Sequence, residues 1–235
     1  MIDSPSTQRK LQTAALRHPL RNGLAVARAG ILSIRHASDL GIAVCERQRY
    51  FKKSIQLALC YSDFCCSFHP REPWHAGEAA FLSCAYDVVT DWRGFDSTYR
   101  SHFEHLLDQY ASFKDLKHIA LKLYEKDRSC TLSDDGLERG AFALRFITEM
   151  MHVREKMERR GINIDTMGKD LQIVDDIMDL ERDQKNADTN CLLSPNRYDH
   201  LRSFLTSNVG YFFPDGSITK ILIEAARQKG RQLCA

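Results

Sequence analysis

Apolar residues recur at the spacing of amphipathic helices along nearly the whole chain, and no stretch alternates apolar and polar residues as a half-buried β-strand does. Segments rich in Pro and Gly, such as those at 69–73 and 213–216, separate the helical stretches. The pattern predicts helices near 9–35, 41–68, 76–92, 98–112, 114–127, 135–160, 165–186, 197–208 and 217–232. A chain of 235 residues is long enough for one substantial core. We therefore predict an all-α, single-domain helical bundle over residues 9–235, after a disordered lead of residues 1–8.

The overall charge and the cysteine pattern exclude several classes of function. Lys and Arg total 33 against 31 Asp and Glu, and basic residues do not interleave with aromatic ones as they do in nucleic-acid-binding motifs. The eight cysteines have no CxxC spacing, which indicates reduced residues rather than a redox site. No apolar run approaches the roughly 18 residues of a membrane span. We therefore expect a cytoplasmic protein without nucleic-acid partners and without a transmembrane segment.

The N-terminal region is basic. The first 38 residues carry six Lys or Arg but only one acid, Asp3. This composition has a weak similarity to an organellar transit peptide. The apolar residues Leu11, Ala15 and Leu20, with those from Leu24 to Ile34, favour an ordinary basic first helix instead.

Two acidic motifs share one spacing: Asp87 to Asp91 reads DVVTD, and Asp179 to Asp183 reads DLERD. On a helix, residues four apart lie on one face, about one turn from each other. Each pair of carboxylates is therefore positioned to hold a hard cation such as Mg²⁺. Two such helices facing each other across a bundle would clamp a diphosphate through bridging metal ions.

The residues around both motifs indicate that these helices are partly buried. Gln172, Asp176, Asp179 and Asp183 form one polar stripe within roughly 60° of the helix circumference, and their neighbours are apolar. Asp87 follows a run of small and apolar residues at 79–85. Carboxylates at this spacing also occur on solvated helices. Clustered carboxylates among apolar residues are costly unless cations relieve them, which favours a metal site.

The second motif resembles a known family. Gly168, Gln172, Asp175, Asp179 and Asp183 fall at the places of the Gly, Gln, Asn and DxxxD residues of the squalene and phytoene synthase branch of the all-α class I isoprenoid synthases, with Asp175 in place of the Asn. The segment is also similar to the second aspartate-rich motif of trans-prenyl diphosphate synthases. The resemblance is specific over about 20 residues of the motif and looser elsewhere.

Other parts of the chain depart from this family. The first motif has a single leading Asp, without the DDxxD and Arg pair of chain-elongating synthases, and the N-terminal region has no segment typical of an isopentenyl diphosphate site. The aromatic, Gly-rich signature of head-to-head coupling enzymes is not visible at 146–156. The segment between Asp91 and Asp175 is also shorter than the family typically has.

The resemblance implies a Mg²⁺-dependent synthase that ionises an allylic prenyl diphosphate, most simply a terpene cyclase. The open alternatives are a prenyltransferase that couples two prenyl diphosphates and a non-catalytic binding protein of the same fold, and a homodimer is an option for the assembly. The implied metal ligands are Asp87, Asp91, Asp175, Asp176, Asp179 and Asp183. The implied catalytic residues are Asp87, Asp91, Asp179, Asp183 and the diphosphate-binding Arg154. The implied substrate-binding residues are Gln172, Lys169, Arg182, Lys185, Phe81, Tyr86, Phe142 and Phe146.

Overall fold

The computed structural model describes residues 5–68, 73–110, 114–129, 136–186, 188 and 190–234. Within these ranges the chain is a single-domain, all-α helical bundle and contains no strand, as the periodicity predicted. The α-helices are α1 (Pro5–Ala15), α2 (Pro19–His36), α3 (Arg47–Phe68), α4 (Pro73–Asp87), α5 (Ser97–Tyr110), α6 (Lys114–Ser129), α7 (Leu137–Met150), α8 (Arg154–Arg159), α9 (Ile164–Asn186), α10 (Arg197–Thr206) and α11 (Ile218–Cys234). A π-helix, η1 (Val88–Trp92), and two 3₁₀ helices, η2 (Cys191–Leu193) and η3 (Val209–Phe212), complete the described elements.

Several helix boundaries differ from the predicted ones, and local residues explain two of the differences. Helix α1 begins at Pro5, so residues 5–8 are helical rather than part of a disordered lead. The single helix expected at 9–35 is divided because Pro19, which has no N–H to continue a helix, begins α2. The helix expected at 135–160 is divided at His152, whose φ of 53° is left-handed. None of the described helices is long and apolar enough to cross a membrane.

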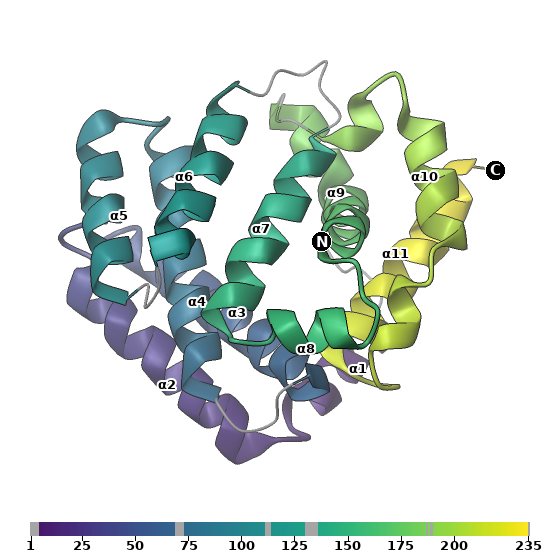
Figure 1. Cartoon of the computed structure of the whole chain (residues 1–235), viewed down its shortest axis with the longest axis horizontal. Coiled ribbons are helices and arrows are strands. Elements are labelled where there is room, and N and C mark those ends of the chain that lie inside the picture. The colour runs from purple at the N-terminus through teal and green to yellow at the C-terminus, as the bar shows by residue number, and fades with distance from the viewer. Residues whose placement is uncertain are drawn as a thin grey trace.

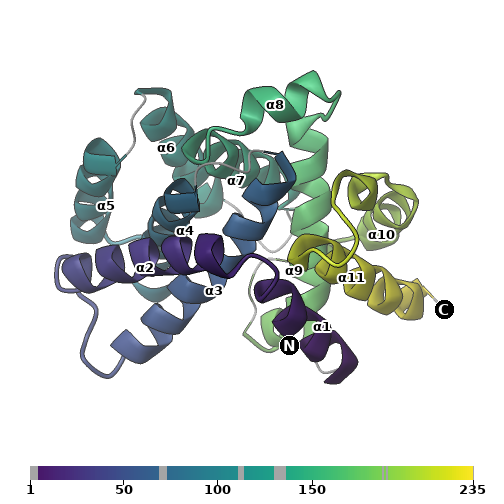
Figure 2. The ribbon, with the colours of Figure 1, turned by 90° about the horizontal axis from the view of Figure 1, so that it is seen from below.

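The helices surround a central space. In Figure 1, α5 and α6 lie at one side of the molecule and α10 and α11 at the other, with α4, α7 and α9 between them. Figure 2 shows that α2 runs along the outside, in front of α3 and α4. This arrangement places α4 and η1, which carry the first acidic motif, across the central space from α9, which carries the second.

Two glycines bring α7 and α9 into backbone contact. A Cβ atom at Gly140 would lie 2.3 Å from the carbonyl oxygen of Gly168, and one at Gly168 would lie 2.4 Å from the carbonyl oxygen of Gly140. Side chains at either position would force the helices apart. This contact fixes α7 against the part of α9 that precedes the acidic motif.

Candidate functional site

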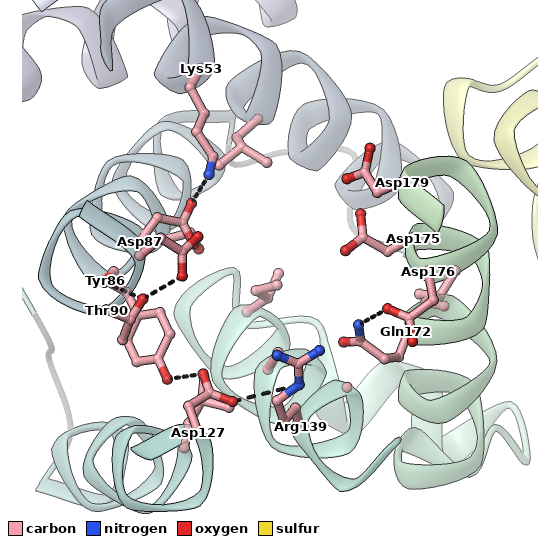
Figure 3. Close-up of a pocket in the computed structure, with 18 of the residues that line it drawn as sticks. Lys53, Tyr86, Asp87, Thr90, Asp127, Arg139, Gln172, Asp175, Asp176 and Asp179 are labelled. Carbon is pink, nitrogen blue, oxygen red and sulfur yellow. Dashed lines mark hydrogen bonds and ion pairs between the residues drawn. The ribbon is translucent and has the colours of Figure 1, made fainter. Parts of the chain in front are cut away.

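A cavity of about 1280 Å³ lies between the two motif-bearing helices (Figure 3). Acidic side chains outnumber basic ones among its lining residues. Much of the remaining wall is apolar. Its apolar lining includes Leu57, Tyr61, Phe64, Phe103, Leu144, Phe146, Leu171 and Met178. The cavity therefore combines a region that attracts cations with a region that suits a hydrocarbon chain.

The first motif lies where α4 changes into the π-helix. Asp87 ends α4, and Asp91 belongs to η1, so the motif does not follow a regular α-helix. The Asp87 carboxylate lies 2.7 Å from the ammonium nitrogen of Lys53 on α3. Burial and the nearby Asp91 raise the pKa of Asp87 to about 6, although Lys53 opposes this change. Both motif carboxylates line the cavity.

The second motif divides its carboxylates between two roles. Asp175 and Asp179 face the cavity in Figure 3. Asp176 and Asp183 also contribute to the cavity lining, but they are only 1% and 5% exposed, and their oxygens accept hydrogen bonds from the chain that follows α9. Of the four α9 carboxylates that line the cavity, the two more accessible ones are therefore Asp175 and Asp179, again four residues apart.

Hydrogen bonds connect the buried pair to the segment after α9. The backbone N–H of Cys191 donates to Asp176 at 2.7 Å, and the Gln172 amide donates to its other oxygen at 2.8 Å. The Asn190 amide donates to the Asp183 carboxylate at 2.9 Å and to the Asp176 carbonyl at 2.8 Å. These bonds satisfy both buried carboxylates. They also hold the segment from Asn190 against α9.

The acidic wall formed by α9 makes Asp175 hard to ionise. Asp175 is open to the cavity, but the protein walls around it displace much of the bulk water. This desolvation, together with the carboxylates of Asp179 and Asp176, raises the pKa of Asp175 to about 7. A bound divalent cation would favour the ionised form, because it would offset the repulsion between these groups. Protons and cations are therefore expected to compete at this wall.

This competition predicts how stability changes with pH. The folded-state pKa values of Asp87 and Asp175, about 6 and about 7, exceed their ordinary value of 3.8. Between these limits these two carboxyl groups bind more protons in the folded protein than in the unfolded chain. Without divalent cations, their contribution therefore lowers the melting temperature as pH rises from about 4 to about 7. Asp175→Asn should reduce this slope, and added Mg²⁺ should restore stability near pH 7. Melting curves across this pH range check the prediction, and an equal slope in the variant would contradict it.

A third group of polar residues lies between the two acidic walls (Figure 3). The hydroxyl of Tyr86 donates to the carboxylate of Asp127 on α6, and the Nε atom of Arg139 on α7 lies 3.6 Å from the other oxygen of that carboxylate. Burial raises the pKa of Asp127, while Tyr86 and Arg139 act in the opposite direction. This group places a guanidinium in the wall of the cavity.

The sequence analysis did not identify Lys53, Asp127 or Arg139. Lys53 and Asp127 lie in no motif, so the fold alone brings them to the cavity. A signal for Arg139 was present, because it precedes Gly140, a glycine inside a helical pattern. Such a glycine often marks a close packing contact. Here that contact is with α9.

The substrate-binding residues predicted from the sequence are divided between the cavity and other places. Tyr86, Phe146, Gln172 and Arg182 line the cavity, and Arg182 forms ion pairs of 2.9 Å with both Asp179 and Asp183. The other four are not among the lining residues: Lys169, Lys185, Phe81 and Phe142. Arg154, which was predicted as a catalytic residue, does not line the cavity either.

These five residues lie elsewhere in the structure, outside the cavity wall. Arg154 pairs with Glu149 and Glu158 at α8, and Lys169 pairs with Glu138. Lys185 is exposed in the last turn of α9. Phe81 is fully buried beside the rings of His36 and Tyr110, and Phe142 lies under the Arg145 guanidinium. The separation of Arg154 from the cavity follows from the break at His152, which directs α8 away from the axis of α7.

The donor set of the site consists of carboxylate oxygens, which hard cations prefer. Across the described residues, no three His, Cys, Asp or Glu side chains lie close enough together to form a metal site by themselves. Comparison with protein-family models, curated proteins and solved structures finds no match to this chain. The assignment of function therefore rests on the residues of the cavity.

Proposed function

We propose that this chain is a class I isoprenoid synthase, an enzyme that ionises an allylic prenyl diphosphate. The observation that carries the proposal is the pairing of carboxylates across the cavity: Asp87 and Asp91 on one wall, Asp175 and Asp179 on the other. A diphosphate between these walls would be repelled unless cations joined the two. The apolar remainder of the cavity would then hold the prenyl chain.

Mg²⁺ fits this donor set. It is usually bound through one or two carboxylates, with substrate phosphate oxygens and water completing the octahedron, so a cluster of three protein ligands is not required. Asp87 with Asp91 and Asp175 with Asp179 would each hold such a cation. When bound, Mg²⁺ would neutralise the charge that develops on the departing diphosphate.

The basic residues of the cavity would orient the diphosphate. The side chains of Lys53, Arg139 and Arg182 line the cavity, and they belong to three different helices. Arg139 and Arg182 present planar guanidinium groups, which bind phosphate oxygens in a fixed geometry. These residues replace Arg154 in the role that the sequence suggested for it.

The aromatic side chains of the cavity would protect and stabilise a carbocation. Tyr61, Phe64 and Phe146 line its apolar part. Ring faces attract positive charge, and an apolar wall excludes the water that would quench the cation. When the C–O bond breaks, the bonding electron pair leaves with the diphosphate oxygen. The prenyl chain is left with the positive charge.

Within this class, we propose terpene cyclisation of a single prenyl diphosphate as the reaction. The second candidate is coupling of two prenyl diphosphates. The observation in favour of coupling is the size of the cavity. Its volume of about 1280 Å³ exceeds the upper end, about 1000 Å³, of cavities that hold one drug-sized ligand. One long chain or two shorter chains would fill this space.

The test is release of diphosphate by the purified chain from geranyl, farnesyl and geranylgeranyl diphosphate, each supplied alone, with Mg²⁺ or with a chelator. The expected result is release that requires Mg²⁺, with a cyclic hydrocarbon or alcohol in the extract. A product with the carbon atoms of two substrates would identify coupling instead. Folded protein that releases no diphosphate from any of these substrates, alone or in pairs, would overturn the proposal.

A further inference from the structure

The outward face of α2 is apolar, although it lies at the surface of the molecule (Figure 2). Leu20, Leu24, Ile31 and Ile34 are 86%, 54%, 53% and 66% exposed, and Ala27 is exposed between them. A surface helix normally carries charged and polar residues on its outer side. The exposed face of α2 is therefore a candidate docking surface.

These five residues follow one another at intervals of four, three, four and three, so they form a single stripe along the helix. Leu16, which is 74% exposed in the turn before α2, adjoins the beginning of this stripe in the sequence. The opposite face of the helix packs against α3 and α4, where Ala25, Ala29 and Leu32 are fully buried. Helix α2 is thus apolar on two sides. Helices α3 and α4 cover one side, and the stripe on the other side is exposed.

The charge around the stripe is positive. No Asp or Glu occurs between Asp3 and Asp39. Arg21, Arg28 and Arg35 recur every seven residues and therefore lie along the same edge of the stripe. Arg28 pairs with Glu78 on α4, whereas Arg21 lies 2.9 Å from the Cys66 sulfur and Arg35 is exposed.

We propose that this face of α2 docks on a membrane surface that contains anionic phospholipids. The aliphatic stripe would enter the boundary between headgroups and acyl chains. The exposed Arg35 would extend from its edge to the phosphates, and Arg21 would join it on release from Cys66. A lipid surface supplies both an apolar layer and negative charge. A second copy of the chain fits less well, because its own α2 segment contains no acidic residue to pair with these arginines.

The test is co-sedimentation of the full chain with vesicles of phosphatidylcholine alone or mixed with phosphatidylserine. Binding to the mixed vesicles is expected, and raised salt should weaken it. The double variant Leu20→Glu/Ile31→Glu should bind the mixed vesicles about tenfold or more weakly, because it places charges on the stripe. Both side chains are exposed, so the variant should retain the helical circular dichroism and melting temperature of the wild type.

Tyr211→Glu is the matched control, since Tyr211 is 80% exposed but lies in η3, outside the stripe. It should bind the vesicles as the wild type does. Failure of the wild type to bind, or equal binding by the double variant, would overturn the proposal. A dimer in lipid-free solution that the double variant abolishes would also overturn it and assign the face to a second copy. None of these readouts requires catalysis, so they are independent of the proposed synthase activity.

Discussion

Asp179→Asn is expected to lower kcat for Mg²⁺-dependent diphosphate release by about 100-fold or more. Asn has nearly the shape of Asp, but it lacks the negative charge that would hold a cation against the diphosphate. Asp179 faces the cavity, and the bonds that satisfy the buried carboxylates of α9 do not depend on it. The change should therefore act on catalysis far more than on folding. Initial rates of diphosphate release, compared with melting temperatures, check this.

Glu181→Gln is the matched control for this variant. It makes the same carboxylate-to-amide change two residues away on α9, at an exposed position that is not part of the cavity lining. Its release rate should stay within about twofold of the wild type, because surface changes away from a site have small effects. Equal rates in Asp179→Asn and Glu181→Gln would show that Asp179 has no role in ionisation.

Gly140→Ala is expected to lower the free energy of unfolding by about 3 kcal/mol or more, which corresponds to a melting temperature roughly 10 °C lower. The new Cβ would lie 2.3 Å from the Gly168 carbonyl oxygen and 2.5 Å from the Gln172 Cβ. The first of these is a backbone atom within α9, near its N-terminal end, so only a shift of a helix backbone relieves the contact. Thermal and denaturant unfolding measure the change.

Gly23→Ala is the control for this prediction. Gly23 is also within a helix, α2, but no atom lies within 4 Å of a Cβ atom placed there. Alanine should stabilise the protein by about 0.5–1 kcal/mol through its higher helix propensity. If Gly140→Ala proved as stable as the wild type, the close contact between α7 and α9 would not exist in solution.

The helical class of the fold was predictable because helical periodicity extends along almost the entire chain. The boundaries were less predictable where a single residue decides them. Pro19 divides one expected helix, and the left-handed φ of His152 divides another, although the apolar pattern continues through both positions. Periodicity reports which face of a helix is buried, but not whether the backbone continues through a break.

The placement of the acidic motifs opposite each other was predicted, but the roles of individual carboxylates were not. The helical spacing placed Asp176 and Asp183 on one polar stripe with Asp179. In the structure, the carboxylates of Asp176 and Asp183 instead accept hydrogen bonds from Cys191 and Asn190. The sequence could not show this, because the segment after α9 must first fold back. Lys53 and Arg139 were not predicted for the same reason. Contacts between helices bring them to the cavity, and residue spacing along the sequence does not show such contacts.

The π-helix of the first motif shows that equal spacing in sequence does not mean equal geometry. Asp175 and Asp179 are separated by a regular α-turn of α9, whereas the wider turn of η1 separates Asp87 from Asp91. The two carboxylate pairs are therefore arranged differently on their helices, although both have a spacing of four residues. A single-residue deletion within 88–90 would convert η1 towards a regular α-helix and would leave the two carboxylates of this motif three residues apart. The spacing of the carboxylates in the first motif therefore depends on one residue of η1, whereas that of Asp175 and Asp179 follows from the regular helix α9.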